Sequence, residues 1–182
     1  MKTRRILQPA KAAKTTGILT NAKMIIRKAK KEDLNDLAGL HIHLIRQIQK
    51  CKPWKYCVAK TTVAYFKKKI LKLFKNKDAS IDVAEEDGKI IGYSIGIVKN
   101  YPSFINFKKY GELYEVSINP KFRGGGIGPK LAKRTLEFFK SKNVEIAEAL
   151  VDNKNIIALK TWKKLGFKED LFVLLKKLKS KK

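Results

Sequence analysis

The fold is decided by the stretch Arg123-Gly124-Gly125-Gly126-Ile127-Gly128. A β-rich run, 112–118, comes before it, and a helical pattern, 129–142, follows it. Successive glycines let backbone amides come close together without Cβ atoms between them, and the start of a helix adds the positive end of its dipole at the same place. These residues therefore predict a strand, a glycine turn and a helix that together bind an anion, most readily a phosphate group.

The two most familiar phosphate-binding loops do not fit this stretch. No Lys-Ser or Lys-Thr pair follows the glycines, as a P-loop requires, and the GxGxxG spacing of a dinucleotide-binding turn is absent from it. What remains is Arg123, two unrestricted positions, and then Gly126 and Gly128 with one residue between them. A glycine-rich turn in an ordinary α/β protein is the alternative interpretation.

This pattern resembles the signature of the GNAT superfamily of acetyl-CoA-dependent N-acetyltransferases. The superfamily has Arg or Gln, two free positions, Gly, one free position, and Gly or Ala after a strand, and Arg123, Gly126 and Gly128 occupy the three defined positions. A second segment, 155–167, resembles the Asn-x-x-Ala helix that ends in Gly-Phe near the end of GNAT domains. Both motifs occur in the family's order, and the resemblance covers roughly residues 24–178.

The resemblance implies a mixed α/β fold of the GNAT type. Such a fold has a mostly antiparallel sheet whose central parallel strands splay apart, with helices flanking the sheet. Hydrophobic periodicity agrees with it and predicts two amphipathic helices in the first half of the chain and an Asp-Gly hairpin turn at Asp87-Gly88. The pattern also predicts the following strands: 25–29, 80–85, 89–98, 112–118, 144–151, and a closing strand or strand pair within 167–178.

The length predicts one domain, which we place at residues 24–182. Residues 1–23 contain basic but no acidic side chains and no hydrophobic periodicity, so we interpret them as a flexible basic arm. The longest apolar run, 90–98, is too short to span a bilayer. We therefore expect no membrane span and a cytoplasmic location.

The formal net charge of +26 is the most unusual bulk property. Only six of the 42 basic residues are arginine, and the lysines are spread along the whole chain. A protein that reads nucleic-acid bases would more often concentrate arginine and aromatic residues on one face. Dispersed lysines predict, at most, non-specific contact with RNA or acidic surfaces.

Histidine and cysteine positions predict no metal site. His41 and His43 are two residues apart on a predicted helix, so they point to different faces. The spacing of Cys51 and Cys57 matches neither a redox CxxC motif nor a zinc knuckle, and we interpret both as ordinary thiols. His41 falls on the apolar stripe of its helix, which is typical of a histidine at the edge of the core.

The resemblance also implies which residues bind acetyl-CoA. In GNAT proteins the pantetheine arm lies between the splayed strands and pairs with the backbone of the first, which here is Val116, Ser117 and Ile118. The diphosphate would bind the amides of Arg123, Gly124, Gly125, Gly126, Ile127 and Gly128. Asn155 would reach the cofactor from the other side.

Two glutamates are candidates for the base that deprotonates the acceptor. Glu112 falls where histone-acetylating GNAT proteins have a glutamate, and Glu115 falls at the acidic position of some small-amine acetyltransferases. Their odd spacing places them on opposite faces of a regular strand, unless a bulge of the kind GNAT strands often carry re-aims one of them. Either residue could instead be a solvated carboxylate.

Trp162 stands where many GNAT proteins have the tyrosine that protonates the leaving thiolate. An indole cannot donate a proton as a phenol does. Departure as a bare thiolate costs only about 2 kcal/mol at pH 7, so the loss would slow turnover without abolishing it. Tyr114 or Tyr110 could take over this role, and Trp162 could equally pack on the apolar face with Ala158.

The resemblance therefore implies an acetyl-CoA-dependent N-acetyltransferase. The acceptor would be a primary amine, either a protein N-terminus, a lysine or a small amine, and it would attack the thioester directly. The high net positive charge, and Trp162 in place of the usual tyrosine, are also compatible with an alternative function. In that alternative the chain is a basic RNA- or ribosome-associated protein of the GNAT fold with little or no catalytic activity.

Overall fold

The computed structural model describes residues 24–52, 55–56 and 58–176. The predicted basic arm, 1–23, and Cys57 lie outside the described residues, as does the side chain of Cys51. The strands are β1 (Ile25–Lys28), β2 (Ala79–Glu86), β3 (Lys89–Asn100), β4 (Lys109–Ile118) and β5 (Ile146–Glu148). The helices are α1 (Leu34–Cys51), α2 (Thr62–Phe74), α3 (Ile127–Ser141) and α4 (Ile156–Lys164), with short 3₁₀ turns at Lys31–Asp33 and Pro120–Phe122.

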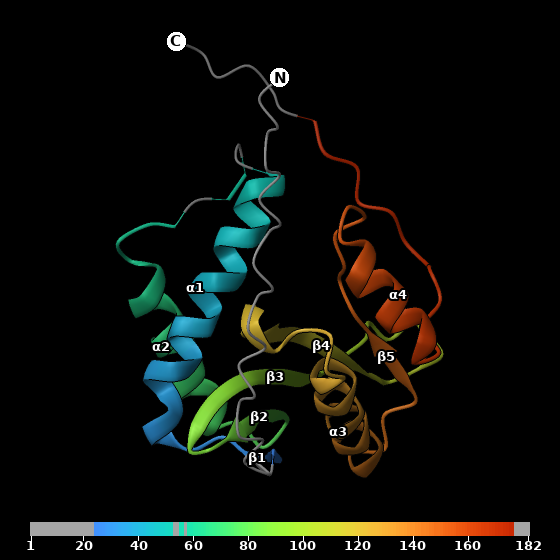
Figure 1. The fold of residues 1–182 in the computed structure, drawn as a ribbon. Coiled ribbons are helices and arrows are strands. Elements are labelled where there is room, and N and C mark those ends of the chain that lie inside the picture. Colours follow the sequence, from blue (N-terminus) through green and yellow to red (C-terminus); the bar gives the residue numbers. More distant parts are fainter. Residues whose placement is uncertain (1–23, 53–54, 57, 177–182) are drawn as a thin grey trace, which may run out of the picture.

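The strands form one mixed sheet in the order β1-β2-β3-β4-β5 (Figure 1). Strands β1 to β4 are antiparallel neighbours, and β5 joins β4 in parallel after the α3 crossover. The hairpin between β2 and β3 turns at Asp87 and Gly88, whose φ angles of 49° and 72° are both positive, as a primed turn requires. The predicted mixed sheet and hairpin are confirmed.

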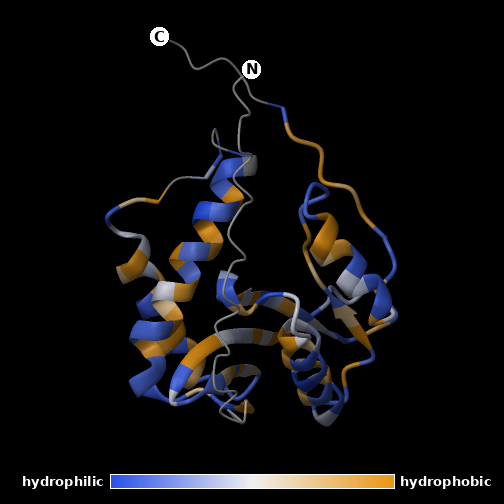
Figure 2. Ribbon diagram, in the orientation of Figure 1, coloured by the Kyte–Doolittle hydropathy of each residue, from blue (hydrophilic) through white to orange (hydrophobic). Residues whose placement is uncertain are grey.

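Helices α1 and α2 cover one face of the sheet. Leu37, Phe66 and Ile70 from these helices pack with Val83 and Tyr93 of the sheet in one buried cluster. The polar faces of both helices point outward (Figure 2). Each helix therefore buries an apolar stripe of the kind that its sequence predicts.

Helix α3 covers the opposite face. Leu131 packs with Ala84 and Ile91 in a second cluster. Phe139 lies over Gly111 of β4, where an added Cβ would come within 2.4 Å of the ring. The absence of a side chain at Gly111 lets the last turn of α3 pack directly on β4.

The predicted closing strand within 167–178 is wrong for residues 167–176, the part that the structure describes, because none of them joins the sheet. This segment is extended, and Figure 2 colours a run of its residues as hydrophobic. They are exposed by 71 to 92% at Leu171, Phe172, Val173 and Leu174. An apolar run is typical of the side chains of a strand, but a strand also needs a neighbouring strand to pair with. The outermost strand on this side, β5, is short, and its pairs end at Glu148.

None of the helices in the described residues has the length and apolar character needed to cross a membrane. The cytoplasmic location stays a prediction.

Candidate active site

The glycine turn is open to solvent and precedes the N-terminus of α3. Gly124 and Gly126 have φ angles of 86° and 75°, a backbone conformation that glycine adopts without strain. A Cβ on either residue would meet nothing within 4 Å in the described structure. Because the first N–H groups of a helix have no acceptor within it, the amides of Gly126, Ile127 and Gly128 are available to a ligand, whereas Pro129 supplies none.

Arg123 anchors this turn to the end of β4. Its Nε donates a hydrogen bond to the carbonyl oxygen of Ile118 at 3.1 Å. The side chain of Asn119 accepts a hydrogen bond from the N–H of Lys121 at 3.1 Å and stabilises the short 3₁₀ turn between the strand and the glycines. The guanidinium is thus used to hold the loop in place, and the backbone amides are left to meet an anion.

Strands β4 and β5 pair over three residues and then separate. The pairs are Tyr110 with Ile146, Gly111 with Ala147, and Glu112 with Glu148. Among the described residues, the edge of β4 that faces β5 has no strand partner over 113–118. The strand predicted at 144–151 is therefore shorter than expected, because it diverges from its neighbour.

This unpaired edge of β4 runs directly to the glycine turn. On its other edge, Val116, Ser117 and Ile118 pair with β3. Ser117 is also held by its hydroxyl, which donates to the carbonyl oxygen of Leu40 in α1 at 3.1 Å. The backbone that the family resemblance assigns to pantetheine is therefore fixed by β3 on one edge and has no strand on the other among the described residues, where the Ile118 carbonyl oxygen accepts from Arg123.

A β-bulge in β4 decides where the two candidate carboxylates point. Glu115 pairs with Ile95 on β3. The next β3 residue pairs with Leu113, which leaves Tyr114 as the extra residue of the bulge. Residues three apart lie on opposite faces of a regular strand, but one inserted residue returns them to the same face. Glu112 and Glu115 therefore both lie on the face covered by α1 and α2.

Glu115 lies in a partly apolar environment, on the part of β4 that is no longer paired with β5. Its side chain is 9% exposed, and its Oε1 lies 2.9 Å from Nδ1 of His41. The same oxygen accepts a hydrogen bond from the hydroxyl of Tyr93. Burial and the charge of Glu115 raise the pKa of Tyr93, so this phenol stays protonated and donates. His41 is positioned by stacking on Phe66, with ring centres 4.0 Å apart.

Glu112 has a different environment. It lies in the part of β4 that is still paired with β5. Its Oε2 forms an ion pair with Nζ of Lys99 at 2.7 Å, and this hydrogen bond raises the pKa of Lys99. Glu112 is thus neutralised by a neighbouring cation, whereas Glu115 is held by two hydrogen-bond partners at the open part of the strand.

Tyr114, the bulged residue, lies between these two glutamates in the sequence and is 38% exposed. Partial burial raises its pKa, so the phenol keeps its proton at neutral pH. Nζ of Lys69, from α2, lies 3.4 Å from the centre of the Tyr114 ring. Tyr110, the other tyrosine considered as a proton donor, stacks on Tyr101 with ring centres 4.4 Å apart, at the closed end where β4 and β5 pair.

Trp162 and Asn155 belong to α4, on the far side of the separating strands. The Trp162 ring packs edge-on against Phe167, with centres 5.9 Å apart, which favours a packing role. Asn155 is the N-cap of α4, and its side chain accepts a hydrogen bond from the N–H of Ala158 at 3.2 Å. Within the part of the chain that the structure describes, no side chain or backbone group accepts a hydrogen bond from its side-chain amide nitrogen. Asp152, which precedes α4, forms an ion pair with Lys52, just after the end of α1, at 2.8 Å.

Sequence reasoning missed three residues of this site: His41, Tyr93 and Lys69. His41 was interpreted as a core-edge histidine, and it does pack on Phe66, but it also contacts a glutamate 74 positions away. A polar ring on an apolar stripe is the signal that could have prompted a search for a partner. Nothing in the sequence indicates which partner it would meet.

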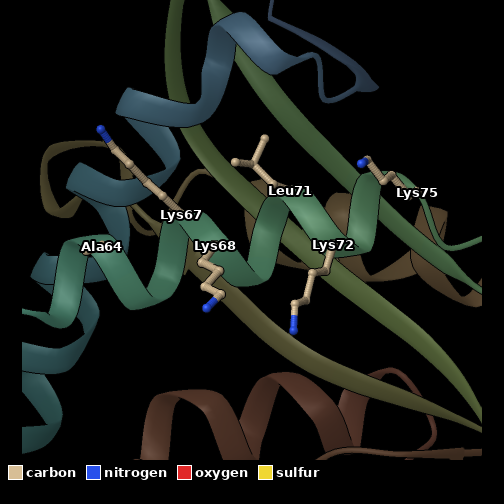
Figure 3. Close-up of a pocket in the computed structure, with 6 residues that line it drawn as sticks. All are labelled: Ala64, Lys67, Lys68, Leu71, Lys72 and Lys75. Atoms are coloured by element: carbon tan, nitrogen blue, oxygen red, sulfur yellow. The ribbon is translucent and has the colours of Figure 1, made fainter.

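The described residues contain no group of three or more His, Cys, Asp or Glu side chains placed to hold a metal ion. A hollow of about 410 Å³ lies along α2 and is lined by Ala64, Lys67, Lys68, Leu71, Lys72 and Lys75 (Figure 3). It is separate from the glycine turn and from Glu115.

Comparison with known proteins assigns the family. Residues 44–167, more than half of the chain, match the model of the acetyltransferase (GNAT) family. The chain belongs to the GNAT acetyltransferase family. The matched residues run from α1 to the end of the Gly-Phe motif and include the glycine turn and both glutamates, so the predicted family is confirmed.

Relatives of this GNAT chain support the same family assignment. An uncharacterised N-acetyltransferase of Archaeoglobus fulgidus is 34% identical over 132 residues, which are 72% of this chain and 84% of that protein. Another, of Methanocaldococcus jannaschii, is 32% identical over 79% of this chain, but the match spans only 60% of that protein. The crystal structure of a predicted acetyltransferase with acetyl-CoA from Clostridium acetobutylicum shares the fold, with a TM-score of 0.67 and 20% identity over 85% of this chain and 96% of that one.

Proposed function

We propose that this GNAT acetyltransferase transfers an acetyl group from acetyl-CoA to a primary amine by direct attack of the amine on the thioester. One observation carries the proposal: the unpaired edge of β4 leads straight into a glycine turn that is open at the N-terminus of a helix. A backbone edge suits the amide-rich pantetheine arm, and helix amides suit a diphosphate.

The residues that would hold acetyl-CoA are those of this edge and turn. Val116, Ser117 and Ile118 would pair with the pantetheine through their backbone. The amides of Gly124, Gly125, Gly126, Ile127 and Gly128 would meet the diphosphate, whereas the Arg123 amide donates to the Pro120 carbonyl oxygen at 3.5 Å and would have to leave it to join them. Asn155 would use its side-chain amide nitrogen from the α4 side. Acetyl-CoA supplies the activated acetyl group, and the chain supplies binding, orientation and proton transfer.

The acceptor amine must lose a proton before it can attack. A lysine-like amine with a pKa of ~10.4 is neutral in about one molecule in 10^3 at pH 7, which corresponds to roughly 4 to 5 kcal/mol. An α-amino group with a pKa of ~7.7 needs only about 1 kcal/mol. We assign the role of base to Glu115, because it lies at the open part of β4 and is oriented by Tyr93 and His41. Glu112 is less suited, since Lys99 neutralises it.

The leaving thiolate needs a proton donor or must depart as the anion. We assign the proton to the Tyr114 hydroxyl, because the bulge places this tyrosine beside Glu115 at the open part of β4. Its raised pKa keeps the phenol protonated at neutral pH. Trp162, packed against Phe167, then has no part in proton transfer.

The proposal is tested by incubating the full chain with acetyl-CoA and a panel of peptides and amines, and by following acetylated products by mass spectrometry. We expect a mass increase of one acetyl group on a primary amine, dependent on both protein and acetyl-CoA. Free thiol released in step with the product, with no burst of thiol from protein and acetyl-CoA in the absence of an amine, would support direct transfer over an acetyl-enzyme intermediate. Binding of CoA without transfer to any amine would contradict the catalytic part of the proposal.

A second candidate function is non-specific RNA binding on the same fold. It is favoured by Lys67, Lys68, Lys72 and Lys75, which surround the hollow on α2 (Figure 3). Binding of this kind weakens steeply as salt is raised, because it depends on counterion release. A salt-dependent RNA affinity that falls when these lysines are changed to glutamine, together with no acetyl transfer, would favour this function over catalysis.

A further inference from the structure

Lys69 lies on the edge of α2 that faces the open part of β4. Its Nζ is 3.4 Å from the centre of the Tyr114 ring, which is a cation–π contact. Burial lowers the pKa of Lys69, and the charges of Glu115 and Glu112 act on it from nearby in the opposite direction. Partial desolvation makes the charge of this ammonium group act more strongly on whatever enters the site.

Lys69 differs from the other charged groups around it in its partners. Lys99 forms an ion pair with Glu112, and Glu115 is held by His41 and by a tyrosine. Within the described residues, Lys69 forms no ion pair of its own. It is therefore a fixed, partly desolvated cation beside the proposed base and has no carboxylate bound to it.

We propose that Lys69 binds an acidic group of the acceptor, so that the preferred acceptor is a primary amine that also carries a carboxylate or a phosphate. The inference rests on the proposed function, because it concerns the acceptor side of the same site. Lysine is a compact point charge with three donors, so it accepts either kind of anion. The acceptor's amine would then lie toward Glu115 and its acidic group toward Lys69.

The same arrangement disfavours polycationic acceptors. A second ammonium group on the acceptor would meet the like charges of Lys69 and Lys99, which repel it. A fixed positive charge also favours the neutral form of a nearby amine, because it opposes the ammonium state. Lys69 would thus help Glu115 to remove the proton from an acceptor whose acidic group it holds.

The test compares four acceptors of the same chain length: an aliphatic diamine, the amino alcohol, the amino acid and the aminoalkyl phosphate. We expect the wild-type kcat/KM for at least one of the two acidic acceptors to exceed that for the amino alcohol by roughly tenfold or more. The diamine should be the poorest of the four. The amino acid and the phosphate separate a carboxylate preference from a phosphate preference.

Two variants assign the preference to Lys69. Lys69→Met keeps the length of the side chain and should bring the ratio of acidic to neutral acceptor close to one, mainly through KM. Lys69→Arg keeps the charge and should restore most of the preference. Lys72→Met removes the same charge from the outer face of α2 and should leave the ratio unchanged (Figure 3). Thermal melting checks that each variant is folded.

The outcomes separate this inference from the function on which it rests. Equal or greater efficiency with the diamine, or a preference that Lys69→Met leaves intact, overturns the role of Lys69 while acetyl transfer stands. Transfer to none of the four acceptors, combined with no acetylated product in the wider panel, overturns both. Competitive inhibition by an alkyl carboxylate or phosphate that lacks an amine, lost in Lys69→Met, supports the site independently of turnover.

Discussion

Replacing Glu115 with glutamine should remove the base and leave the fold intact. The glutamine oxygen can take the place of Oε1, which accepts the hydrogen bond from Tyr93 and, when Nδ1 of His41 carries the proton, also accepts from His41. For a lysine-like acceptor, deprotonation at pH 7 corresponds to roughly 4 to 5 kcal/mol, and a general base typically contributes 10²- to 10⁴-fold. We therefore expect kcat/KM to fall about 10²- to 10³-fold for such an acceptor.

The size of this loss depends on the pKa of the acceptor. An α-amino acceptor with a pKa of ~7.7 is already partly neutral at pH 7, so its loss should be only about fivefold. As the pH rises, the Glu115→Gln rate should climb roughly tenfold per unit up to the pKa of the acceptor, and the gap to wild type should narrow. Thiol release and product mass, measured from pH 6 to 10, give both profiles.

Glu112→Gln is the matched control, because it makes the same change three residues away on the same face of the sheet. It loses its ion pair with Lys99 but not the proposed base, so kcat/KM should change by less than about fivefold. If Glu112→Gln has the larger effect, or if Glu115→Gln keeps full activity at pH 7 on a lysine-like amine, the assignment of the base is wrong.

Three further substitutions test the proton donor and the packing of α3 on β4. Tyr114→Phe keeps the ring beneath Lys69 and removes only the hydroxyl, so kcat should fall about 10- to 30-fold, in line with about 2 kcal/mol for departure of a bare thiolate. Trp162→Phe should change kcat by less than about threefold, and the reverse order would contradict the assignment. Gly111→Ala would place a Cβ 2.4 Å from the Phe139 ring, so it should destabilise the fold by roughly 1 to 3 kcal/mol. An unchanged melting temperature would show that α3 does not pack as closely on β4 as described.

The order of the elements and the glycine turn could be predicted from the sequence, because each depends on local chemistry. Asp87-Gly88 predicts its own turn, and Gly124 and Gly126 predict theirs through positive φ angles that glycine adopts readily. The separation of β4 and β5 was implied only by the family resemblance.

The arrangement of the acceptor side could not be predicted, because it depends on register and on distant contacts. Alternation alone places Glu112 and Glu115 on opposite faces, and only the extra residue at Tyr114 brings them together. The contact between His41 and Glu115 joins α1 to β4 and has no local signature. The apolar run within 167–176 shows the opposite limit, since a strand-like pattern formed no strand without a partner edge.

The most direct test of the account is calorimetric titration of the full chain with CoA, for the wild type, Gly126→Asp and Gly88→Asp. Gly126 and Gly88 have φ angles of 75° and 72°, and a Cβ on either would meet nothing within 4 Å in the described residues, so both changes carry a similar strain of about 1 to 2 kcal/mol and add the same charge. A carboxylate at Gly126 would stand where the diphosphate is expected to bind.

We predict that the wild type and Gly88→Asp bind CoA with similar Kd values, and that Gly126→Asp raises the Kd roughly 10- to 100-fold while remaining folded. No detectable CoA binding by the wild type, or equal affinity in all three proteins, would contradict the claim that this glycine turn binds the diphosphate of CoA.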